Sequence, residues 1–260
     1  MAKALLEKSR SINKTLQKIG GNPVNFFEIA EVMASNLECS VFIFGRRGQL
    51  TGYAFNDKSP CTGIEELKSY VERFPESFNQ EFNNIQETQT NVTLEPGRKC
   101  LFYYNEGDCN CSDRFWSITP VFGGAKRIGT LILMKENEGF SDEDIVLSEY
   151  GAIVVANEIM RMISERIEEQ ARKKASVQIA LATLSFSERG AIEHILDELD
   201  GTEGLLVASR IADQVGITRS VIVSALRKFE SAGVIESRSL GMKGTYIKIL
   251  NDHLLEELRK

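Results

Sequence analysis

The sequence has no apolar run long enough to cross a membrane. A transmembrane helix needs about 20 consecutive, mostly apolar residues, whereas the longest clean apolar stretches here lie near residues 40–44 and 152–156. Residues 1–8 alternate charged with apolar side chains and lack the apolar core of a signal peptide. We therefore expect a cytoplasmic protein with no membrane partner.

Cysteine and histidine are both scarce. The five cysteines are irregularly spaced, none follows residue 111, and the two histidines, His194 and His253, lie far away in sequence. Disulfide-stabilised folds have a denser, even set of cysteines, and a structural zinc site usually takes four nitrogen or sulfur ligands. We expect a reducing compartment and no metal. The close pair Cys109 and Cys111 favours a structural or incidental role, with a metal or redox site as the alternative.

The sequence also lacks the patterns of common catalytic sites. It has no Gly-x-Ser-x-Gly, no paired Cys and His within a motif, and no carboxylates clustered between glycine turns. The absence of a Gly-x-x-x-x-Gly-Lys-Ser/Thr loop and of Asn-Lys-x-Asp excludes a P-loop GTPase. We expect no enzyme. A nucleotide hydrolase is the enzymatic alternative, which an assay of phosphate release from GTP would detect.

The 260 residues, of which 42% are hydrophobic and 26% charged, are typical of an ordinary globular chain with about two domains. In the first part, helices are expected over residues 3–18, 26–33 (with Asn25 as N-cap), 64–72 and 75–82. Strands are expected over residues 39–44, 50–55, 100–105, 115–122 and 128–135. This order indicates an α+β, sensor-like domain in which helices cover an antiparallel sheet and leave a pocket.

A long helix is predicted next. Ser141 is placed to cap it, and no Gly or Pro interrupts the chain from Ala152 to about Leu184. Apolar residues recur every seven positions at Val146, Ile153, Met160 and Ile167, with Ala156 and Ile163 in companion positions. Such a seam usually pairs with another helix, and an unbroken helix of this length exceeds the width of one domain. A dimer interface is favoured; the alternative is a helix that lies on its own domain.

Residues 208–227 have the spacing of a helix-turn-helix. Ala212 is small where two helices cross, Gly216 supplies the turn, and Thr218 is expected to cap the second helix. The residues expected to face inward are Ile211, Val215, Ile217, Ile222, Ala225 and Leu226. Those expected to face DNA from the second helix are Arg219, Ser220, Ser224 and Arg227, the first two at the end that enters the major groove.

A wing is predicted after the helix-turn-helix. Strands over residues 234–237 and 245–250 flank a loop in which Arg238 and Lys243 can lie on phosphates. Residues 205–250 hold seven basic and three acidic residues, a net charge of +4, which leaves −10 for the remainder of a chain whose total is −6. This asymmetry indicates that one module meets a polyanion. The alternative is a buried helical hairpin with a solvated basic face.

These residues resemble the CodY family of global transcriptional repressors. The likeness is carried by residues 205–223 and 237–248, and further matches at 4–10, 22–25, 45–48 and 129–133 extend it over essentially the whole chain. It implies a GAF-type ligand-sensing domain over 1–140, a long linker helix over 141–184 and a winged helix-turn-helix domain over 185–260. It also implies homodimers, possibly tetramers, on palindromic double-stranded DNA. Ala208 joins the positions expected to meet that DNA.

In the family, branched-chain amino acids (isoleucine, valine or leucine) and GTP raise DNA affinity, so the resemblance implies both effectors here. The positions that match its apolar effector pocket are Phe74, Pro75, Phe78, Leu101, Phe102 and Tyr103. Ile64 stands where the family has the arginine that clamps the ligand carboxylate. A carboxylate in an apolar pocket needs a charge-assisted partner. The candidates are Lys58, Lys68, Arg73 and backbone amides.

The family's proposed GTP site matches Arg46, Arg47 and Glu158 in this chain. Two family lysines are replaced, by Gln49 and Ile163, and the loss of two cations should weaken triphosphate binding. For Arg46 and Arg47, an ordinary solvated turn is the alternative.

Ser220 is a candidate phosphorylation site. Beside a DNA phosphate, a phosphoserine would add roughly −1.5 to −2 charges and oppose binding. The alternative is that Ser220 only supports the helix cap made by Thr218.

For the whole protein, the rival to a nutrient-responsive DNA-binding repressor is a small-molecule sensor that acts through protein partners. A gel shift with a palindromic duplex separates the two.

Overall fold

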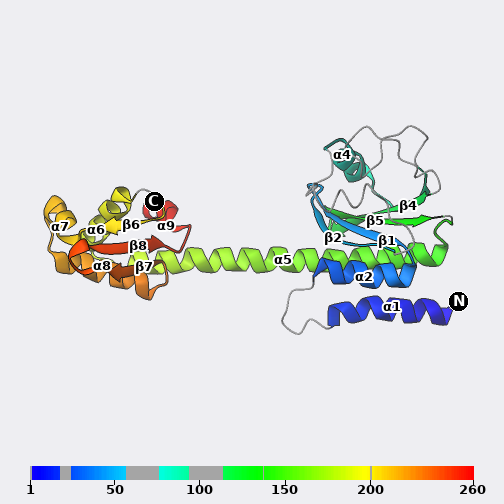
Figure 1. Cartoon of the computed structure of the whole chain (residues 1–260), viewed down its shortest axis with the longest axis horizontal. Coiled ribbons are helices and arrows are strands. Elements are labelled where there is room, and N and C mark those ends of the chain that lie inside the picture. The colour runs from blue at the N-terminus through cyan, green and yellow to red at the C-terminus, as the bar shows by residue number, and fades with distance from the viewer. Residues whose placement is uncertain (1, 18–24, 57–75, 94–113, 137, 200) are drawn as a thin grey trace. The chain divides into compact units, whose positions relative to one another are not determined.

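The computed structural model describes residues 2–17, 25–56, 76–93, 114–136, 138–199 and 201–260. The chain divides into two compact units, Met1–Ile163 and Ser164–Lys260 (Figure 1). Each unit combines helices with an antiparallel sheet, so the predicted α+β class is confirmed. Among the described residues, no helix is both long and apolar enough to cross a lipid bilayer.

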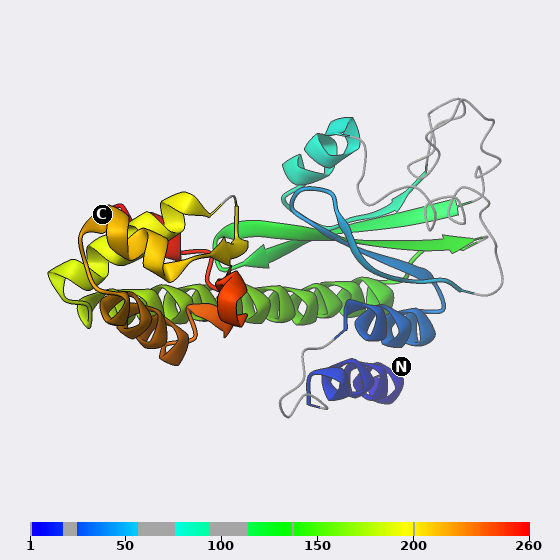
Figure 2. The ribbon, with the colours of Figure 1, turned by 60° about the vertical axis from the view of Figure 1, so that its left-hand side comes forward.

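The first unit contains a five-stranded antiparallel sheet in the order β2-β1-β5-β4-β3. Its strands are β1 (Ser40–Gly45), β2 (Leu50–Ala54), β3 (Gln89–Val92), β4 (Arg114–Gly123) and β5 (Lys126–Glu136). Its helices are α1 (Ala2–Gln17), α2 (Phe26–Leu37), α4 (Glu76–Asn84) and the first part of α5 (Asp142–Ala182). The α2 and α5 helices lie on one side of the sheet, and α4 lies on the other (Figures 1 and 2).

Both faces of the central strands are apolar. Strand residues alternate between the two faces, and Val41, Ile43 and Leu133 belong to the cluster that includes α2 and α5. The residues between them, such as Phe42 and Ile132, are also buried. A sheet covered on both sides gives near-continuous apolar strands instead of an alternating pattern, which is the pattern of residues 40–44.

Most of the helices and strands predicted in this unit are confirmed. Asn25 caps α2 by accepting from the Phe27 amide at 3.0 Å, and both predicted hairpins form, β1–β2 and β4–β5. The strand β3 was not predicted, because Gln89-Thr-Asn-Val92 is mostly polar. The helix expected over 64–72 and the strand expected over 100–105 lie outside the described residues.

The long helix is α5, with 41 residues. Ser141 caps its first turn, as predicted, by accepting from the Asp144 amide at 3.3 Å. The seven-residue row of apolar side chains is exposed, with exposed fractions between 45% and 63% at Val146, Ile153, Met160 and Ile167. Ala156, in a companion position, is instead buried in the core of the first unit. The row therefore presents an apolar stripe without cover from the described residues.

The second unit contains a three-stranded antiparallel sheet in the order β6-β8-β7. Its strands are β6 (Glu203–Leu206), β7 (Ile235–Ser239) and β8 (Thr245–Ile249). Its helices are the end of α5, α6 (Phe186–Glu198), α7 (Ala208–Val215), α8 (Arg219–Ser231), the 3-10 turn η1 (Gly241–Lys243) and α9 (Leu254–Leu258). Val177 and Ala180 of α5 are buried in the core of this unit together with residues of α6, α7 and α8. The last turns of α5 are therefore part of its fold.

Candidate nucleic-acid interface

The predicted helix-turn-helix is formed by α7 and α8. Gly216 follows α7 with φ +70°, in the left-handed region that glycine adopts without strain, and its amide donates to the Ala212 carbonyl. The predicted inward side chains are buried or packed against the core of the second unit: Ile211, Val215, Ile217, Ile222, Ala225 and Leu226. This packing fixes the outer face of α8.

The predicted cap by Thr218 is wrong in one respect. Thr218 occupies the N-cap position of α8, but its side chain makes no capping hydrogen bond. Its hydroxyl is hydrogen-bonded with that of Ser220 at 2.7 Å instead. The Thr218 hydroxyl thus points to the Ser220 side chain and not to the backbone amides of the first turn. The first amides of α8 therefore have no side-chain acceptor at the N-cap, and such amides readily bind phosphate.

The start of α7 also has a backbone amide without a side-chain acceptor at the N-cap. Val207 is its N-cap residue and has no side-chain cap, so the amide of Ala208 has no capping partner there. The Ala208 side chain is packed against the core of the unit. If Ala208 contacts DNA, its backbone N–H makes that contact.

Four of the predicted DNA-facing residues lie together in one open groove. The groove has a volume of about 1020 Å³ and runs between the end of α5 and α8. Its lining includes Ile179 and Thr183 of α5 and, from the predicted set, Arg219, Ser220, Ser224 and Arg227. The structure thus brings the predicted residues of α8 to one surface.

On the helix-turn-helix and the wing, five exposed cations have no carboxylate partner among the described residues. They are Arg210 of α7, Arg219 and Arg227 of α8, and Arg238 and Lys243 of the wing. By contrast, Lys228 is paired with Glu188 at 2.7 Å and Lys248 with Glu203 at 3.7 Å. The positive charge available to a polyanion is thus concentrated on the helix-turn-helix and the wing. Arg210 was missed as a site residue, although its position in the first turn of α7 pointed to it.

Ser224 and Lys228 are fixed by a carboxylate of α6. The Ser224 hydroxyl donates to Glu188 Oε1 at 2.8 Å, and Lys228 Nζ donates to Glu188 Oε2 at 2.7 Å. Glu188 also forms a capping box with Ser185 at the start of α6. The hydrogen bond from Lys228, followed by those from Ser185 and Ser224, lowers the pKa of Glu188 to about 2. Glu188 therefore ties α8 to the start of α6. The sequence pattern Ser185-x-x-Glu188 could have revealed the capping box, though not the contact with α8.

The wing is held by its own backbone. The Leu240 amide donates to the Gly244 carbonyl at 2.8 Å and closes the loop between β7 and β8. Gly244 has φ +111°, and a Cβ there would lie 2.4 Å from the Leu206 carbonyl oxygen. Only glycine fits so close to β6. Lys243 therefore lies in a loop whose path is fixed on both sides, whereas Arg238, expected in that loop, is a residue of β7 and pairs with Tyr246 of β8.

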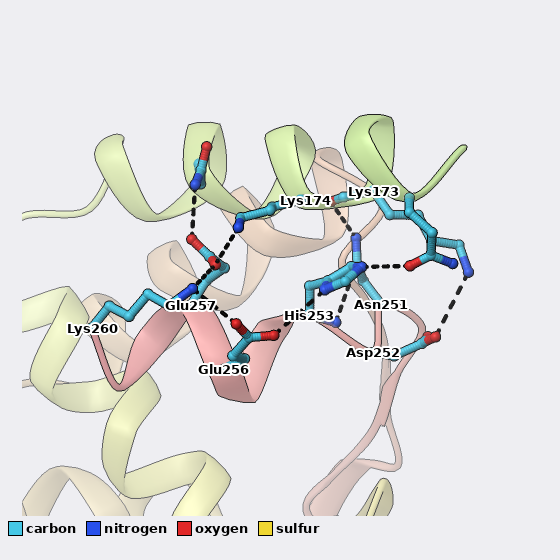
Figure 3. A network of polar contacts seen from close by, with 10 residues as sticks. Lys173, Lys174, Asn251, Asp252, His253, Glu256, Glu257 and Lys260 are labelled. Atoms are coloured by element: carbon cyan, nitrogen blue, oxygen red, sulfur yellow. Dashed lines mark hydrogen bonds and ion pairs between the residues drawn. The ribbon is translucent and has the colours of Figure 1, made fainter. Parts of the chain in front are cut away.

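A polar network joins the end of α5 to the C-terminal residues (Figure 3). The buried Asn251 donates to the Lys173 carbonyl at 2.8 Å, and His253 Nε2 is hydrogen-bonded with Gln170 at 2.7 Å. Glu257 accepts from Gln178 at 2.8 Å. These contacts make α5 from residue 170 onward part of the DNA-binding unit. No local pattern revealed them, since the partners are about 80 residues apart.

The predicted effector pocket lies mostly outside the described residues. This applies to Phe74, Pro75, Leu101, Phe102 and Tyr103, and also to Lys58, Ile64, Lys68, Arg73, Cys109 and Cys111. Phe78 belongs to α4, of which the backbone is described at that position. Among the described residues, no group of three or more His, Cys, Asp or Glu could hold a metal ion.

The described residues fix α4, the helix that carries Phe78. The side-chain amides of Asn79 and Asn83 donate to the Arg46 carbonyl at 3.3 and 3.2 Å. Arg127 of β5 donates to the Phe82 carbonyl at 3.0 Å, and its burial lowers the pKa of the guanidinium to about 10. A cation is favourable at the C-terminal end of a helix. Arg127 therefore ties the end of α4 to the sheet.

The candidate GTP residues fall in two environments. Arg46 and Arg47 have exposed side chains in the turn between β1 and β2. Glu158 of α5 is buried and forms an ion pair with Arg161 at 2.5 Å. A buried carboxylate that already binds an arginine is not in itself a nucleotide ligand, and the role of all three stays a prediction.

Comparisons with known proteins cover nearly the whole chain. The profile described as the CodY GAF-like domain matches residues 4–183, and that of the CodY helix-turn-helix domain matches residues 202–260. The chain is 52% identical to the global transcriptional regulator CodY of Clostridium botulinum over 257 residues, 99% of this chain and 98% of that protein. It is 51% identical to the same regulator of Clostridium tetani, with the same coverage. A solved structure, the cofactor-binding GAF domain of the nutrient sensor CodY from Clostridium difficile, has 31% identity and a TM-score of 0.42, and the match covers 61% of this chain and 99% of that one.

Proposed function

This chain belongs to the CodY family, with a GAF-type domain and a helix-turn-helix DNA-binding domain, and from that premise we propose that it is a cytoplasmic repressor of nutrient-limitation genes. Its relatives are named as transcriptional regulators, a non-enzymatic role that agrees with the expectation of no enzyme. In the proposal, the second unit reads double-stranded DNA and the first unit controls how tightly it binds.

The observation that carries the proposal is the distribution of unpaired charge. Five exposed cations without carboxylate partners among the described residues lie on α7, α8 and the wing. In winged helix-turn-helix proteins, the second helix of the motif enters the major groove and the wing lies on the adjacent backbone. We infer that Arg219 reaches a base edge or phosphate from the first turn of α8, with Thr218 and Ser220 beside it and Arg238 and Lys243 on the backbone.

We further propose a homodimer on a palindromic operator. The exposed row of Val146, Ile153, Met160 and Ile167 on α5 has the seven-residue period that pairs two helices. A two-fold dimer presents two reading helices to half-sites about one helical turn apart, which is why such operators are palindromic.

As effectors we propose a branched-chain amino acid and GTP. An apolar pocket formed by Phe74, Phe78 and Phe102 would suit a branched aliphatic side chain, whose transfer out of water is favourable. For GTP, Arg46 and Arg47 would supply cations for the phosphates. An effector that binds the DNA-competent state more tightly than the other state raises DNA affinity by that difference alone.

Fluorescence anisotropy with a palindromic duplex tests the DNA-binding part. We expect tight, salt-sensitive binding by the full chain, and a large loss when Arg219 and Arg227 are both changed to Ala. Lys126→Ala is the matched control, because Lys126 is an exposed cation of the β4–β5 hairpin in the other unit. Equal binding by the double variant and the wild type would contradict the proposal. Calorimetric titration with isoleucine, valine, leucine and GTP tests the effector part separately.

A further inference from the structure

A cluster of polar contacts joins the edge strand β3 to the start of α5. We call it the β3–α5 junction: Asn91 of β3, Gly139 and Phe140 of the connection after β5, and Lys135 and Asp144 beside them. Asn91 Nδ2 donates to the Phe140 carbonyl at 3.1 Å, and Asn91 Oδ1 accepts from the Phe140 amide at 2.6 Å. One side chain therefore satisfies both backbone groups of a buried residue, much as a neighbouring strand would.

The backbone of β3 is shaped to place this side chain. Asn91 has φ +55°, one of two positive values among the described non-glycine residues. The register of β3 against β4 shifts between Gln89 and Val92, so the strand is irregular at Asn91. Irregularities of this kind re-aim a side chain, and asparagine tolerates the left-handed region better than most residues. The distortion turns Asn91 away from a regular strand position toward Phe140.

Gly139 makes room for this approach. A Cβ at Gly139 would lie 2.7 Å from Asn91 Oδ1, and the φ of Gly139 lies outside the left-handed region. The glycine is therefore needed for the space that Asn91 occupies and not for its own backbone conformation. Two independent substitutions, one on each side of the contact, can break the same pair of hydrogen bonds.

Phe140 connects the contact to α5. It directly precedes Ser141, whose amide donates to Asp144 Oδ2 at 3.0 Å in the first turn of the helix. Lys135 Nζ donates to the same carboxylate oxygen at 2.7 Å and lies 5.2 Å from the centre of the Phe140 ring. Phe140 is thus held by β3 at its backbone, and its ring and the helix cap share one lysine. A displacement of β3 must move the first turn of α5 or break both Asn91 hydrogen bonds.

We propose that Asn91 is a positioning residue that couples effector occupancy to α5 and hence to DNA affinity. The proposal rests on the proposed effector function. In sequence, β3 stands between the two candidate effector segments, residues 74–78 and 101–103, so an effector that binds them would act on segments joined through the chain to a strand linked to the start of α5. The two hydrogen bonds of Asn91 make that link specific to one side chain.

The test uses the full chain as wild type, Asn91→Gly and Gly139→Ala. Glycine at position 91 removes the side chain and keeps the left-handed backbone without strain. Gln89→Gly is the matched control, because Gln89 is an exposed residue of the same strand. For each protein, we would measure isoleucine affinity by calorimetry, the DNA affinity with and without isoleucine, and the amide hydrogen exchange of residues 142–147.

We expect both junction variants to bind isoleucine and, without isoleucine, DNA as the wild type does. The ratio of DNA affinities with and without isoleucine should fall at least about threefold, since allosteric factors commonly span 5–150-fold. Exchange at residues 142–147 should become faster in both variants, and Gln89→Gly should keep the wild-type values.

Three outcomes would overturn the inference. A full isoleucine response in both variants would show that Asn91 does not couple the sites. An equal loss of isoleucine affinity would place Asn91 in the pocket itself. Unchanged exchange at residues 142–147 would remove the physical link, whether or not an effector binds. A wild-type protein whose DNA affinity does not respond to isoleucine, valine, leucine or GTP would instead overturn the proposed effector function, and the coupling with it.

Discussion

Two helices of this protein, one in each unit, begin with the same arrangement of side chains. In the first unit, Asp144 in the first turn of α5 is hydrogen-bonded with Ser141 and accepts from Lys135 at 2.7 Å. We call these three residues the α5 lock. In both units, a carboxylate accepts from amides at a helix start, where the helix dipole favours a negative charge. The same carboxylate also binds a lysine from another element.

The corresponding group in the second unit is the α6 lock, formed by Ser185, Glu188 and Lys228. Glu188 completes a capping box with Ser185 and accepts from Lys228 at 2.7 Å. The lysine comes from α8, the helix that carries the predicted DNA-reading residues, and also donates to the Thr183 carbonyl at 2.9 Å. The α6 lock thus joins the reading helix to its support.

The two locks differ in how far they are buried. The side chains of Lys135 and Asp144 are only 9% and 11% exposed, whereas Lys228 is 36% exposed and Glu188 8%. When one partner of a buried ion pair is removed, the other charge stays uncompensated, while an exposed partner can be hydrated by water. The same motif therefore has two roles. In the first unit it chiefly stabilises the fold, and in the second unit it chiefly orients α8.

The largest expected effect is that of Lys135→Ala, which would leave Asp144 without its cation in a buried site. We expect a loss of about 3–5 kcal/mol in the free energy of unfolding of the first unit. Urea unfolding followed by the fluorescence of Trp116, the single tryptophan and a buried residue of β4, measures it. Lys126→Ala is the control for loss of an exposed lysine. A loss below about 1 kcal/mol would remove the distinction between the two locks.

The second prediction concerns the charge at Ser220. Ser220→Asp should bind operator DNA at least about tenfold more weakly than Ser220→Ala, because like charges at an interface cost several kcal/mol. Its stability should hold or rise slightly, since a negative charge is favourable at a helix N-terminus. Phosphorylation of Ser220 would then act as an off-switch. Gel shifts and thermal melts of both variants test it, and equal DNA affinity would rule the switch out.

The third prediction is that Arg219→Ala lowers specific DNA affinity by about 1–3 kcal/mol with the fold intact. Arg219 is exposed and has no ion-pair partner among the described residues, so its removal leaves no buried group unsatisfied. The urea transition followed by far-UV circular dichroism, which includes the second unit, should therefore be unchanged. Anisotropy with operator and scrambled duplexes measures the effect, and an equal affinity for the operator in the folded variant would contradict the assignment.

The smallest expected effect is that of Glu188→Gln, which removes the charge of the α6 lock and keeps acceptor and donor groups. We expect the second unit to lose about 1–2 kcal/mol at neutral pH, the range for hydrogen bonds to charged groups. Far-UV circular dichroism during urea unfolding reports both units and should show this loss, while Trp116, which reports only the first unit, should show no change. A shift in the Trp116 transition would mean that the two locks do not act separately.

The same variant makes the acid response of the α6 lock visible. The pKa of Glu188 is lowered from 4.5 to about 2, so its contribution to stability is present above pH 4.5 and is lost as the pH falls toward 2. In the wild type, the second unit should lose stability over this range, and Glu188→Gln should lose less. The pKa of Asp144 is lowered too: burial raises it, but the hydrogen bonds from Lys135 and Ser141 outweigh burial. The wild type and Glu188→Gln should therefore show the same loss of stability of the first unit at acid pH, which serves as the internal control.

The helix-turn-helix could be predicted because its determinants are local. The motif needs a turn glycine, a small residue and a buried face of α8 at fixed spacings within 20 residues. The structure confirms all three, with Gly216 at the turn, Ala212 at the helix crossing and the predicted residues of α8 buried. The side-chain cap predicted at Thr218 is not formed, and its spacing in the sequence could not show that its hydroxyl is hydrogen-bonded with that of Ser220 instead. The Glu188 to Lys228 contact was missed because 40 residues separate its partners.

In the first unit, contacts between distant residues were even harder to predict from the sequence. Alternating or continuous apolar residues predicted β1, β2, β4 and β5, but β3 has too few apolar residues to be recognised. Asn91 could not be singled out either, because its role follows from a left-handed backbone and from Phe140, 49 residues away. Spacing along the chain predicts elements, whereas contacts between distant elements require the fold.

The salt dependence of DNA binding tests the central claim most directly, namely that the second unit binds DNA through cations that no carboxylate neutralises. The logarithm of the association constant falls with the logarithm of salt concentration by about 0.9 for each phosphate neutralised. With five such cations on the helix-turn-helix and wing of each chain, a homodimer on a palindromic duplex should give a slope between about −5 and −9. A slope flatter than about −2, or one left unchanged by Arg238→Ala, would contradict the account.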